Sequence, residues 1–239
     1  LVQDYVLQYL PSATTLAAAS APRETRGRLL AMAPARSRLQ FAEREVQDIR
    51  AIFPRGARAL VGSRATEATF KRLAGDYDIL HLATHGFFNK LNPLFSGVQL
   101  EPDAEEDGRL EVHEILEMRL RANLVTLSAC ETALGSGYFS EVPAGDDFVG
   151  LTQAFLSAGS SSVLATLWEV NDRSTRTFMT AFYRDLPREE GRGALASVQR
   201  RMLAGGRYRH PYYWAPFVLV GPNQGTKEGI LAEKSLPRP

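Results

Sequence analysis

The residues of this 239-residue sequence best suited to chemistry are a cysteine and a histidine, each at the end of a short apolar run. Cys130 follows the run at residues 123–129, and His85 follows the run at residues 78–84. Such runs are typical of strands buried in a parallel sheet. If the two strands are neighbours, ~5 Å apart, the two side chains face each other. Because a histidine beside a cysteine favours the nucleophilic thiolate, the pattern indicates a catalytic dyad.

Each of these residues also has a plainer interpretation. A lone cysteine is among the residue types most often buried as a small hydrophobe. A histidine at a strand end commonly bonds to a backbone group. Gly86, directly after His85, adds a third feature, because glycine leaves its backbone N–H unshielded, as an oxyanion donor requires. The combination of all three at strand ends favours catalysis over the structural roles.

The other histidines indicate no metal centre. His81 and His85 have the i, i+4 spacing of a metal-binding pair on a helix. On a strand, however, four residues span ~13 Å, too far to hold one ion. We therefore interpret His81 as a core residue or a support for the site, His113 as exposed on a helix, and His210 as structural or at the surface. With one cysteine and no glycine-rich phosphate loop, the sequence predicts neither a Cys/His metal cluster nor a cofactor.

Strand-like and helix-like segments alternate along the chain. This alternation predicts an α/β fold with a mostly parallel central sheet and helices on both faces, and with ligands bound at the carboxyl ends of the strands. The expected strands are residues 2–9, 28–32, 58–61, 78–84, 123–129, 161–167 and 214–220. The expected helices are residues 39–53, 66–73, 112–118, 148–156, 172–186 and 193–203. Residues 89–108 and 135–147 have loop composition and are expected to shape a substrate groove when ordered.

Composition narrows the class of protein. Apolar residues make up 44% of the chain and charged residues 23%, which is typical of a globular protein. The net charge of +1 argues against a nucleic-acid binder, and no apolar stretch is long enough for a membrane span. A single cysteine fits a reducing cytoplasm. We expect one domain at residues 1–221 and a polar tail at residues 222–239, in a piece of a longer protein because the chain starts at Leu1.

Four segments, in order, resemble the CHAT domain, a caspase-like cysteine peptidase family related to separase. These segments are residues 77–86, 123–132, 164–170 and 210–217. The resemblance implies a three-layer caspase–haemoglobinase-like fold. It also implies a cysteine endopeptidase in which His85 is the general base, Cys130 is the nucleophile, and the N–H groups of Gly86 and Cys130 form the oxyanion hole. The expected partners are a protein or peptide substrate and a regulatory region upstream, such as tetratricopeptide repeats. The alternative is a caspase-like interaction or signalling module that cleaves nothing.

The resemblance also suggests where a substrate side chain binds. Relatives that cleave after Arg or Lys place an acid in the pocket for that side chain, and one common position lies two residues before the nucleophile. Here that position is Ser128, which has no charge. Asp172, or less favourably Glu169, follows the third core strand and offers a carboxylate instead. The plainer alternatives are a helix N-cap for Asp172 and a surface charge for Glu169.

Overall fold

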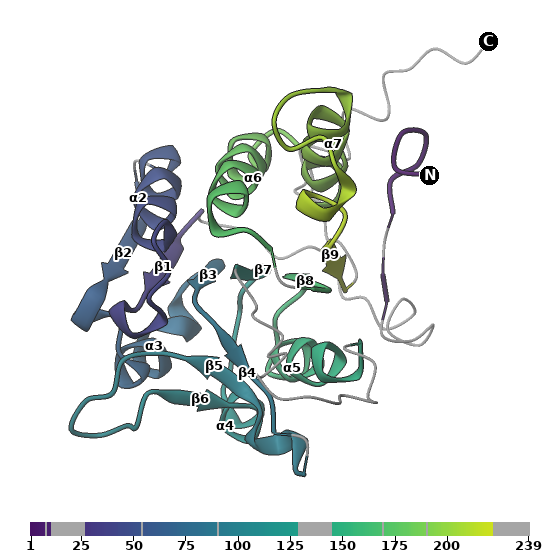
Figure 1. Cartoon of the computed structure of the whole chain (residues 1–239). Helices are drawn as coiled ribbons and strands as arrows, with labels where there is room; N and C mark the ends of the chain where they lie inside the picture. The colour runs from purple at the N-terminus through teal and green to yellow at the C-terminus, as the bar shows by residue number, and fades with distance from the viewer. Residues whose placement is uncertain are drawn as a thin grey trace.

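A central sheet of six strands organises the computed structural model (Figure 1). The structure describes residues 1–7, 9–10, 27–53, 55–89, 91–128, 145–168, 170–189 and 191–221, with only the backbone for 145–149. The strand order is β2-β1-β3-β7-β8-β9; β9 is antiparallel to its neighbour and the other pairs are parallel. The strands are β1 Leu29–Ala33, β2 Ala57–Val61, β3 Ile79–Ala83, β7 Leu124–Ser128, β8 Val163–Thr166 and β9 Phe217–Val220.

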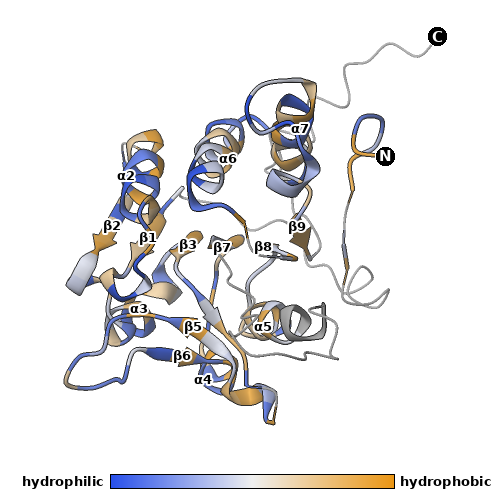
Figure 2. Ribbon diagram, viewed as in Figure 1, coloured by the Kyte–Doolittle hydropathy of each residue, from blue (hydrophilic) through white to orange (hydrophobic). Residues whose placement is uncertain are grey.

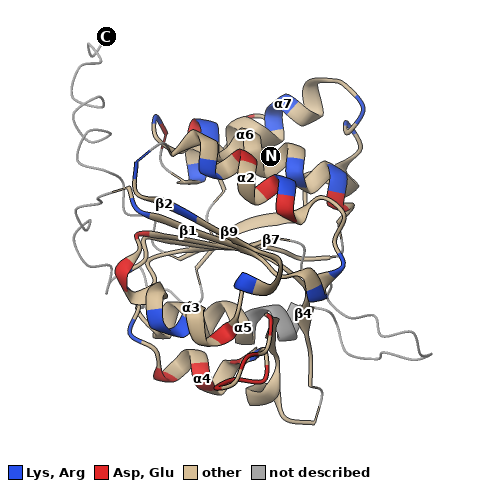
Figure 3. Ribbon diagram, turned by 90° about the vertical axis from the view of Figure 1, so that its left-hand side faces the viewer, with Lys and Arg blue, Asp and Glu red and all other residues tan. Residues whose placement is uncertain are grey.

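Helices cover both faces of this sheet, which Figure 3 shows edge-on. One face carries α2 (Ala42–Ile52), α6 (Asp172–Asp185) and α7 (Gly191–Ala204), and the other carries α3 (Glu67–Leu73), α4 (Val112–Glu117) and α5 (Gly145–Ser157). The central strands are mainly hydrophobic, whereas the helices mix hydrophobic and hydrophilic residues (Figure 2). Each face of the sheet therefore has its own apolar core. The predicted three-layer α/β fold is confirmed.

Short 3-10 helices join several of these elements. They are η1 Ala35–Ser37, η2 Gly62–Arg64, η3 Ala74–Asp76, η4 Pro93–Phe95 and η5 Pro211–Tyr213. Among the described helices, none has the length and apolar character to cross a membrane.

A second, smaller sheet corrects the expectation of a loop at residues 89–108. β4 (Gly86–Phe87), β5 (Gly97–Gln99) and β6 (Arg109–Glu111) form an antiparallel three-stranded sheet within the connection from β3 to β7. Strands of two or three residues are too short to show the alternation of a longer strand. The other expected loop, residues 135–147, lies outside the described residues up to the start of α5 at Gly145.

The expected strand at residues 2–9 is wrong. Residues 2–4 form a turn, and among the described residues of this segment only Tyr9 makes a bridge, with Val220 of β9. The Arg200 guanidinium on α7 donates to the backbone carbonyls of Val2 and Tyr5. These carbonyls are therefore bound by a side chain instead of a neighbouring strand. The expected tail at residues 222–239 lies outside the described residues.

Gly97 is required for the small sheet, and this can be tested by substitution. A Cβ at this position would lie 2.8 Å from the Glu111 Cα and even closer to the Leu110 carbonyl. We expect Gly97→Ala to lower the free energy of unfolding by about 1–3 kcal/mol, because the two strands would have to move apart. The measurement is denaturant unfolding.

Gly150→Ala is the matched control for this substitution. Gly150 lies inside α5, and no atom lies within 4 Å of an added Cβ there. The same chemical change should stabilise the protein by roughly 0.5–1 kcal/mol, because alanine favours a helix interior. Equal effects of the two substitutions would contradict the steric argument.

Candidate functional site

The candidate site lies where β3 and β7 end side by side. The register pairs Ala83 with Ser128, and the Thr84 amide donates to the Ser128 carbonyl at 3.1 Å. His85 and Cys130 each follow two residues after this register pair. The expectation that their strands are neighbours is therefore confirmed. Cys130 itself lies outside the described residues, so the contact between the two side chains stays a prediction.

Gly86 begins β4 directly after His85. The Gln99 amide donates to the His85 carbonyl at 2.9 Å, which makes Gly86 and Val98 a non-hydrogen-bonded pair of the antiparallel ladder. The Gly86 N–H therefore points away from β5. Thr84 secures the same turn, because its hydroxyl donates to the Gln99 carbonyl at 2.5 Å. The β4–β5 ladder therefore does not use the Gly86 amide, and its role as an oxyanion donor stays a prediction.

Beneath the strand ends lies a chain of buried polar side chains. Glu45 Oε1 accepts a hydrogen bond from the Ser128 hydroxyl at 2.5 Å and lies 3.0 Å from His81 Nε2. His81 Nδ1 lies 3.2 Å from the Tyr183 hydroxyl, which donates to Thr126 Oγ1 at 2.8 Å. At most 1% of each side chain is exposed, and burial raises the pKa of Tyr183 so that its phenol stays neutral. The interpretation of His81 as a core residue is confirmed.

Sequence reasoning missed Glu45 and Tyr183 in this network. Glu45 lies on the inner face of α2, beside the buried Val46 and one turn before the buried Ile49. An acid at that position among apolar residues was the available signal, since a buried carboxylate needs polar partners. Tyr183 follows Phe182 on α6, and its hydroxyl gave no comparable signal.

Asp172 joins the first turns of α6 and α2. Asn171, not Asp172, is the N-cap of α6, because its side chain accepts from the Ser174 amide. The Asp172 carboxylate instead accepts from the Phe41 amide at 2.8 Å, directly before α2. Burial raises the pKa of Asp172; the nearby Glu45 raises it further, whereas bonds from backbone amides and the charge of His85 lower it. Asp172 therefore lies within electrostatic reach of both Glu45 and His85.

The residues predicted to line a substrate pocket differ in their positions and in how far they are buried. Ser128 ends β7 and is buried against Glu45. Asp172 is half-buried at the start of α6, beyond β8, and β8 pairs with β7. Glu169 lies outside the described residues. His113 is exposed on α4 and His210 caps η5, both as expected.

The sequence matches the CHAT domain family over residues 1–222. The chain belongs to the CHAT domain family. Tetratricopeptide repeat protein 28 of Mus musculus is 34% identical over 113 residues, 47% of this chain and 4% of that protein. Its Homo sapiens counterpart is 27% identical over 201 residues, 70% of this chain and 8% of that protein. This CHAT domain therefore spans only a small part of the relatives that it matches.

Solved structures place the CHAT domain among caspase-like folds. The Saccharomyces cerevisiae separase–securin complex matches with a TM-score of 0.59 and 14% identity, over 92% of this chain and 14% of that chain. The Arg-specific cysteine proteinase gingipain R matches with a TM-score of 0.58 and 9% identity, over 88% of this chain and 50% of that chain. At these identities the likeness shows the fold.

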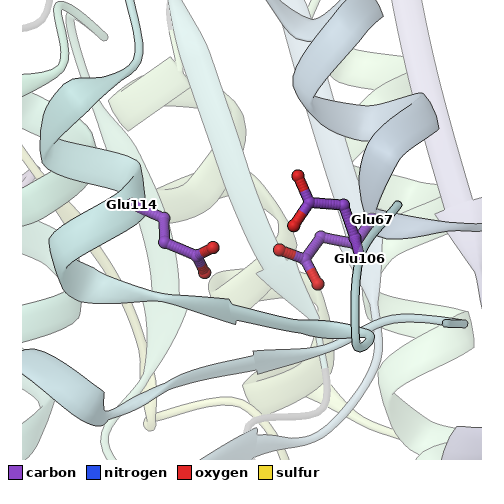
Figure 4. Close-up of side chains that lie close together, drawn as sticks. All are labelled: Glu67, Glu106 and Glu114. Atoms are coloured by element: carbon purple, nitrogen blue, oxygen red, sulfur yellow. The ribbon is translucent and has the colours of Figure 1, made fainter. Parts of the chain in front are cut away.

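A cluster of carboxylates elsewhere in the CHAT domain has the composition of a cation site (Figure 4). Carboxylate oxygens of Glu67, Glu106 and Glu114 lie within 4.8 Å of one another. The Lys71 ammonium lies 2.7–2.8 Å from all three. Burial lowers the pKa of Lys71, but the bonds to the carboxylates outweigh it and raise the pKa overall. This arrangement is a network of ion pairs that joins α3 and α4 to the loop before β6.

Lys71→Met tests the network, because it removes the ammonium and keeps the aliphatic stem. We expect the free energy of unfolding at pH 7 to fall by about 2–4 kcal/mol, since the carboxylates lose their shared partner. Burial already raises the pKa of Glu67, and without Lys71 this rise should be larger, because the bond and the charge that lower the pKa are lost. The folded variant then binds more protons than the unfolded one, so its deficit should shrink from pH 7 to pH 5.

Arg72→Gln is the control, because Arg72 is an exposed cation on the same helix. Its effect on the free energy of unfolding should stay within about 0.5 kcal/mol at both pH values. A deficit of Lys71→Met that is the same at pH 5 and pH 7 would exclude charge repulsion as its cause.

Proposed function

We propose that this CHAT domain is a cysteine endopeptidase that acts through His85 and Cys130. The observation that carries the proposal is the register of β3 and β7. Ala83 pairs with Ser128, and His85 and Cys130 each follow two residues later in the sequence. The caspase-like fold supports it, because separase and gingipain R share that fold. Of these two proteins, gingipain R is an Arg-specific cysteine proteinase, so the fold is compatible with the proposed chemistry.

The proposed reaction has two steps. The Cys130 thiolate attacks the peptide carbonyl, and the Gly86 and Cys130 amides stabilise the oxyanion. The C–N bond then breaks, His85 gives a proton to the leaving amine, and a thioester remains. In the second step His85 takes a proton from water, the resulting hydroxide attacks the thioester, and the C–S bond breaks. This step releases a carboxylic acid product and restores the Cys130 thiolate beside a protonated His85.

A regulatory region is the second element of the proposal. The relatives are named tetratricopeptide repeat proteins and are much longer than this chain. We infer that a repeat region, or another partner, controls access of a protein substrate to the site. The alternative function, a module that binds a partner without cleaving it, shares the fold and is separated from the peptidase by the experiment that follows.

The dyad is tested with an uncharged, thiol-reactive peptide probe and a peptide library. We expect the probe to label Cys130, and Cys130→Ala to abolish both labelling and cleavage. His85→Ala should slow cleavage by about 10²–10⁴-fold, because the general acid and base is lost. Mass spectrometry of the labelled peptide and initial cleavage rates are the measurements.

His113→Asn is the control, because His113 is an exposed histidine on α4. Its cleavage rate should equal that of the wild type. Cleavage that persists in Cys130→Ala would place the nucleophile elsewhere. Labelling without any cleavage would favour the binding module.

We further propose that the substrate has a basic residue before the cut. The Asp172 carboxylate supports this, because it lies beyond β8 within electrostatic reach of His85. Asp172 is not the N-cap of α6, since Asn171 fills that role. Glu169 is the second candidate, whereas Ser128, the third residue predicted for the pocket, is 1% exposed and bonded to Glu45. A carboxylate there would bind a guanidinium or ammonium group by a charge-assisted hydrogen bond.

Asp172→Asn tests this pocket, because the amide oxygen can still accept from the Phe41 amide while the charge is lost. We expect the preference for Arg or Lys over Leu, measured as a ratio of kcat/KM values, to fall about tenfold or more. In the wild type, the same preference should weaken on acidification at a higher pH than for an ordinary aspartate, because burial raises the pKa of Asp172.

Asp48→Asn is the matched control, since Asp48 also joins α2 to α6, through Arg176 at 2.7 Å. It should leave the ratio unchanged. A preference for an apolar residue before the cut, unaffected by either substitution, would refute the pocket.

A further inference from the structure

A polar pocket of about 370 Å³ lies at the end of the sheet opposite the candidate site. Its lining includes Asp76, three residues before β3, and Arg121, three residues before β7. The pocket therefore lies at the amino ends of these strands, whereas His85 follows the carboxyl end of β3. Because a strand of this length spans about 17 Å, the pocket is separate from the proposed peptidase site.

Two arginines reach this pocket from one short segment, residues 118–122, which links α4 to β7. In this segment Leu120 and Ala122 are buried, whereas Arg119 and Arg121 are exposed. Side chains alternate in direction along an extended backbone, so the two arginines share one side, and both line the pocket. Two residues of an extended chain rise by about 6.6 Å, which sets the spacing of the two arginines along the segment.

The backbone of this segment is held by the turn that follows α5. The Leu120 amide donates to the Ala158 carbonyl at 2.8 Å, and the Ser161 amide donates to the Ala122 carbonyl at 2.9 Å. The buried side chains of Leu120 and Ala122 pack in the core on the same side of the sheet. The backbone that carries the two arginines is therefore fixed before any ligand binds, which lowers the entropic cost of binding.

The pocket has an excess of positive charge. Among the residues that the structure describes, the guanidinium groups of Arg119 and Arg121 have neither a hydrogen-bond partner nor an ion-pair partner. Arg72 of α3 also lines the pocket and is exposed, with one nitrogen donating to the Thr69 hydroxyl at 3.2 Å. Asp76 in the lining offsets one of these three charges, so a positive excess remains for a ligand.

We propose that Arg119, Arg121 and Arg72 form a binding site for an extended acidic segment of a partner protein. Side chains at positions i and i+2 of an extended peptide point the same way, about 6.6 Å apart. Two carboxylates at that spacing therefore meet Arg119 and Arg121 together, and each guanidinium can donate two parallel hydrogen bonds. The net charge of +1 favours a short acidic peptide over a nucleic acid, which binds through a larger excess of basic residues.

A purely structural role of these arginines predicts a different outcome. Cations near the C-terminus of a helix interact favourably with the helix dipole. Arg72 lies in the last turn of α3, and Arg119 follows the end of α4. If this were their whole role, replacing them would lower the midpoint of unfolding, and the spacing of carboxylates in an added peptide would have no effect. The deciding quantity is the dependence of peptide binding on that spacing.

The test compares two peptides of equal composition and charge, acetyl-Ala-Glu-Ala-Glu-Ala-amide and acetyl-Ala-Glu-Glu-Ala-Ala-amide. Each is titrated into the isotope-labelled chain and followed by NMR. The first peptide should bind about threefold to fivefold more tightly, because only its carboxylates share one side of an extended chain. Arg119→Gln and Arg121→Gln should each remove most of this difference. Both side chains are exposed, so the two variants should keep the unfolding midpoint of the wild type.

Two further variants serve as controls. Arg58→Gln removes an exposed arginine of β2 that does not line the pocket, and it should leave both dissociation constants unchanged. Asp76→Asn should tighten the binding of both peptides, because it removes a negative charge from the lining.

Three results would overturn the proposal. The first is equal affinity for the two peptides, or no binding of either. The second is an equal loss of binding in Arg58→Gln and Arg121→Gln. The third is displacement of the peptide by inorganic phosphate at a concentration below the dissociation constant of the peptide, because the preferred ligand would then be a phosphate group.

Discussion

The parallel pairing of β3 with β7 is the constraint on which the rest of the structure depends. Parallel neighbours cannot be joined by a tight turn, so the connection from Ala83 to Leu124 has to cross the sheet. That connection contains the small sheet β4–β5–β6 and α4, and it begins with His85 and Gly86 at the carboxyl end of β3. The crossover thus carries the histidine and the predicted oxyanion donor, while the following strand leads to the cysteine.

The buried network stabilises this pairing from one side of the sheet. Glu45 on α2 binds His81 of β3 and Ser128 of β7 through the same carboxylate oxygen. A carboxylate buried without partners would be strongly destabilising. The position of α2 is therefore the one in which Glu45 contacts both His81 and Ser128. The network therefore links the position of a helix to the register of two strands. The Glu45 carboxylate of this network also lies close enough to Asp172 to raise the pKa of Asp172.

The success of the prediction for each strand depended on how many residues carried its pattern of apolar side chains. β3, β7 and β8 were predictable because each is a continuous apolar run, and the alternation of strands and helices predicted a mostly parallel sheet. β4, β5 and β6 were missed, because two or three residues show no alternation. Residues 2–9 have the pattern of a strand but do not form one, since the Arg200 guanidinium donates to two of their carbonyl groups. Glu45 was overlooked because its partners come from strands more than thirty residues away along the chain, and no local pattern encodes them.

Three elements converge at the end of β7: the strand itself with Ser128, α6 with Asp172, and α2 with Glu45. The negative potential that a basic substrate side chain needs is a sum over nearby charges, so it is not tied to one position in the sequence. The Ser128 hydroxyl donates to the buried Glu45 carboxylate, so the polar surroundings of this strand end come from α2 as well as from β7. In this fold, the electrostatic surroundings of a strand end are therefore set as much by the helix packed beneath it as by the residue on the strand.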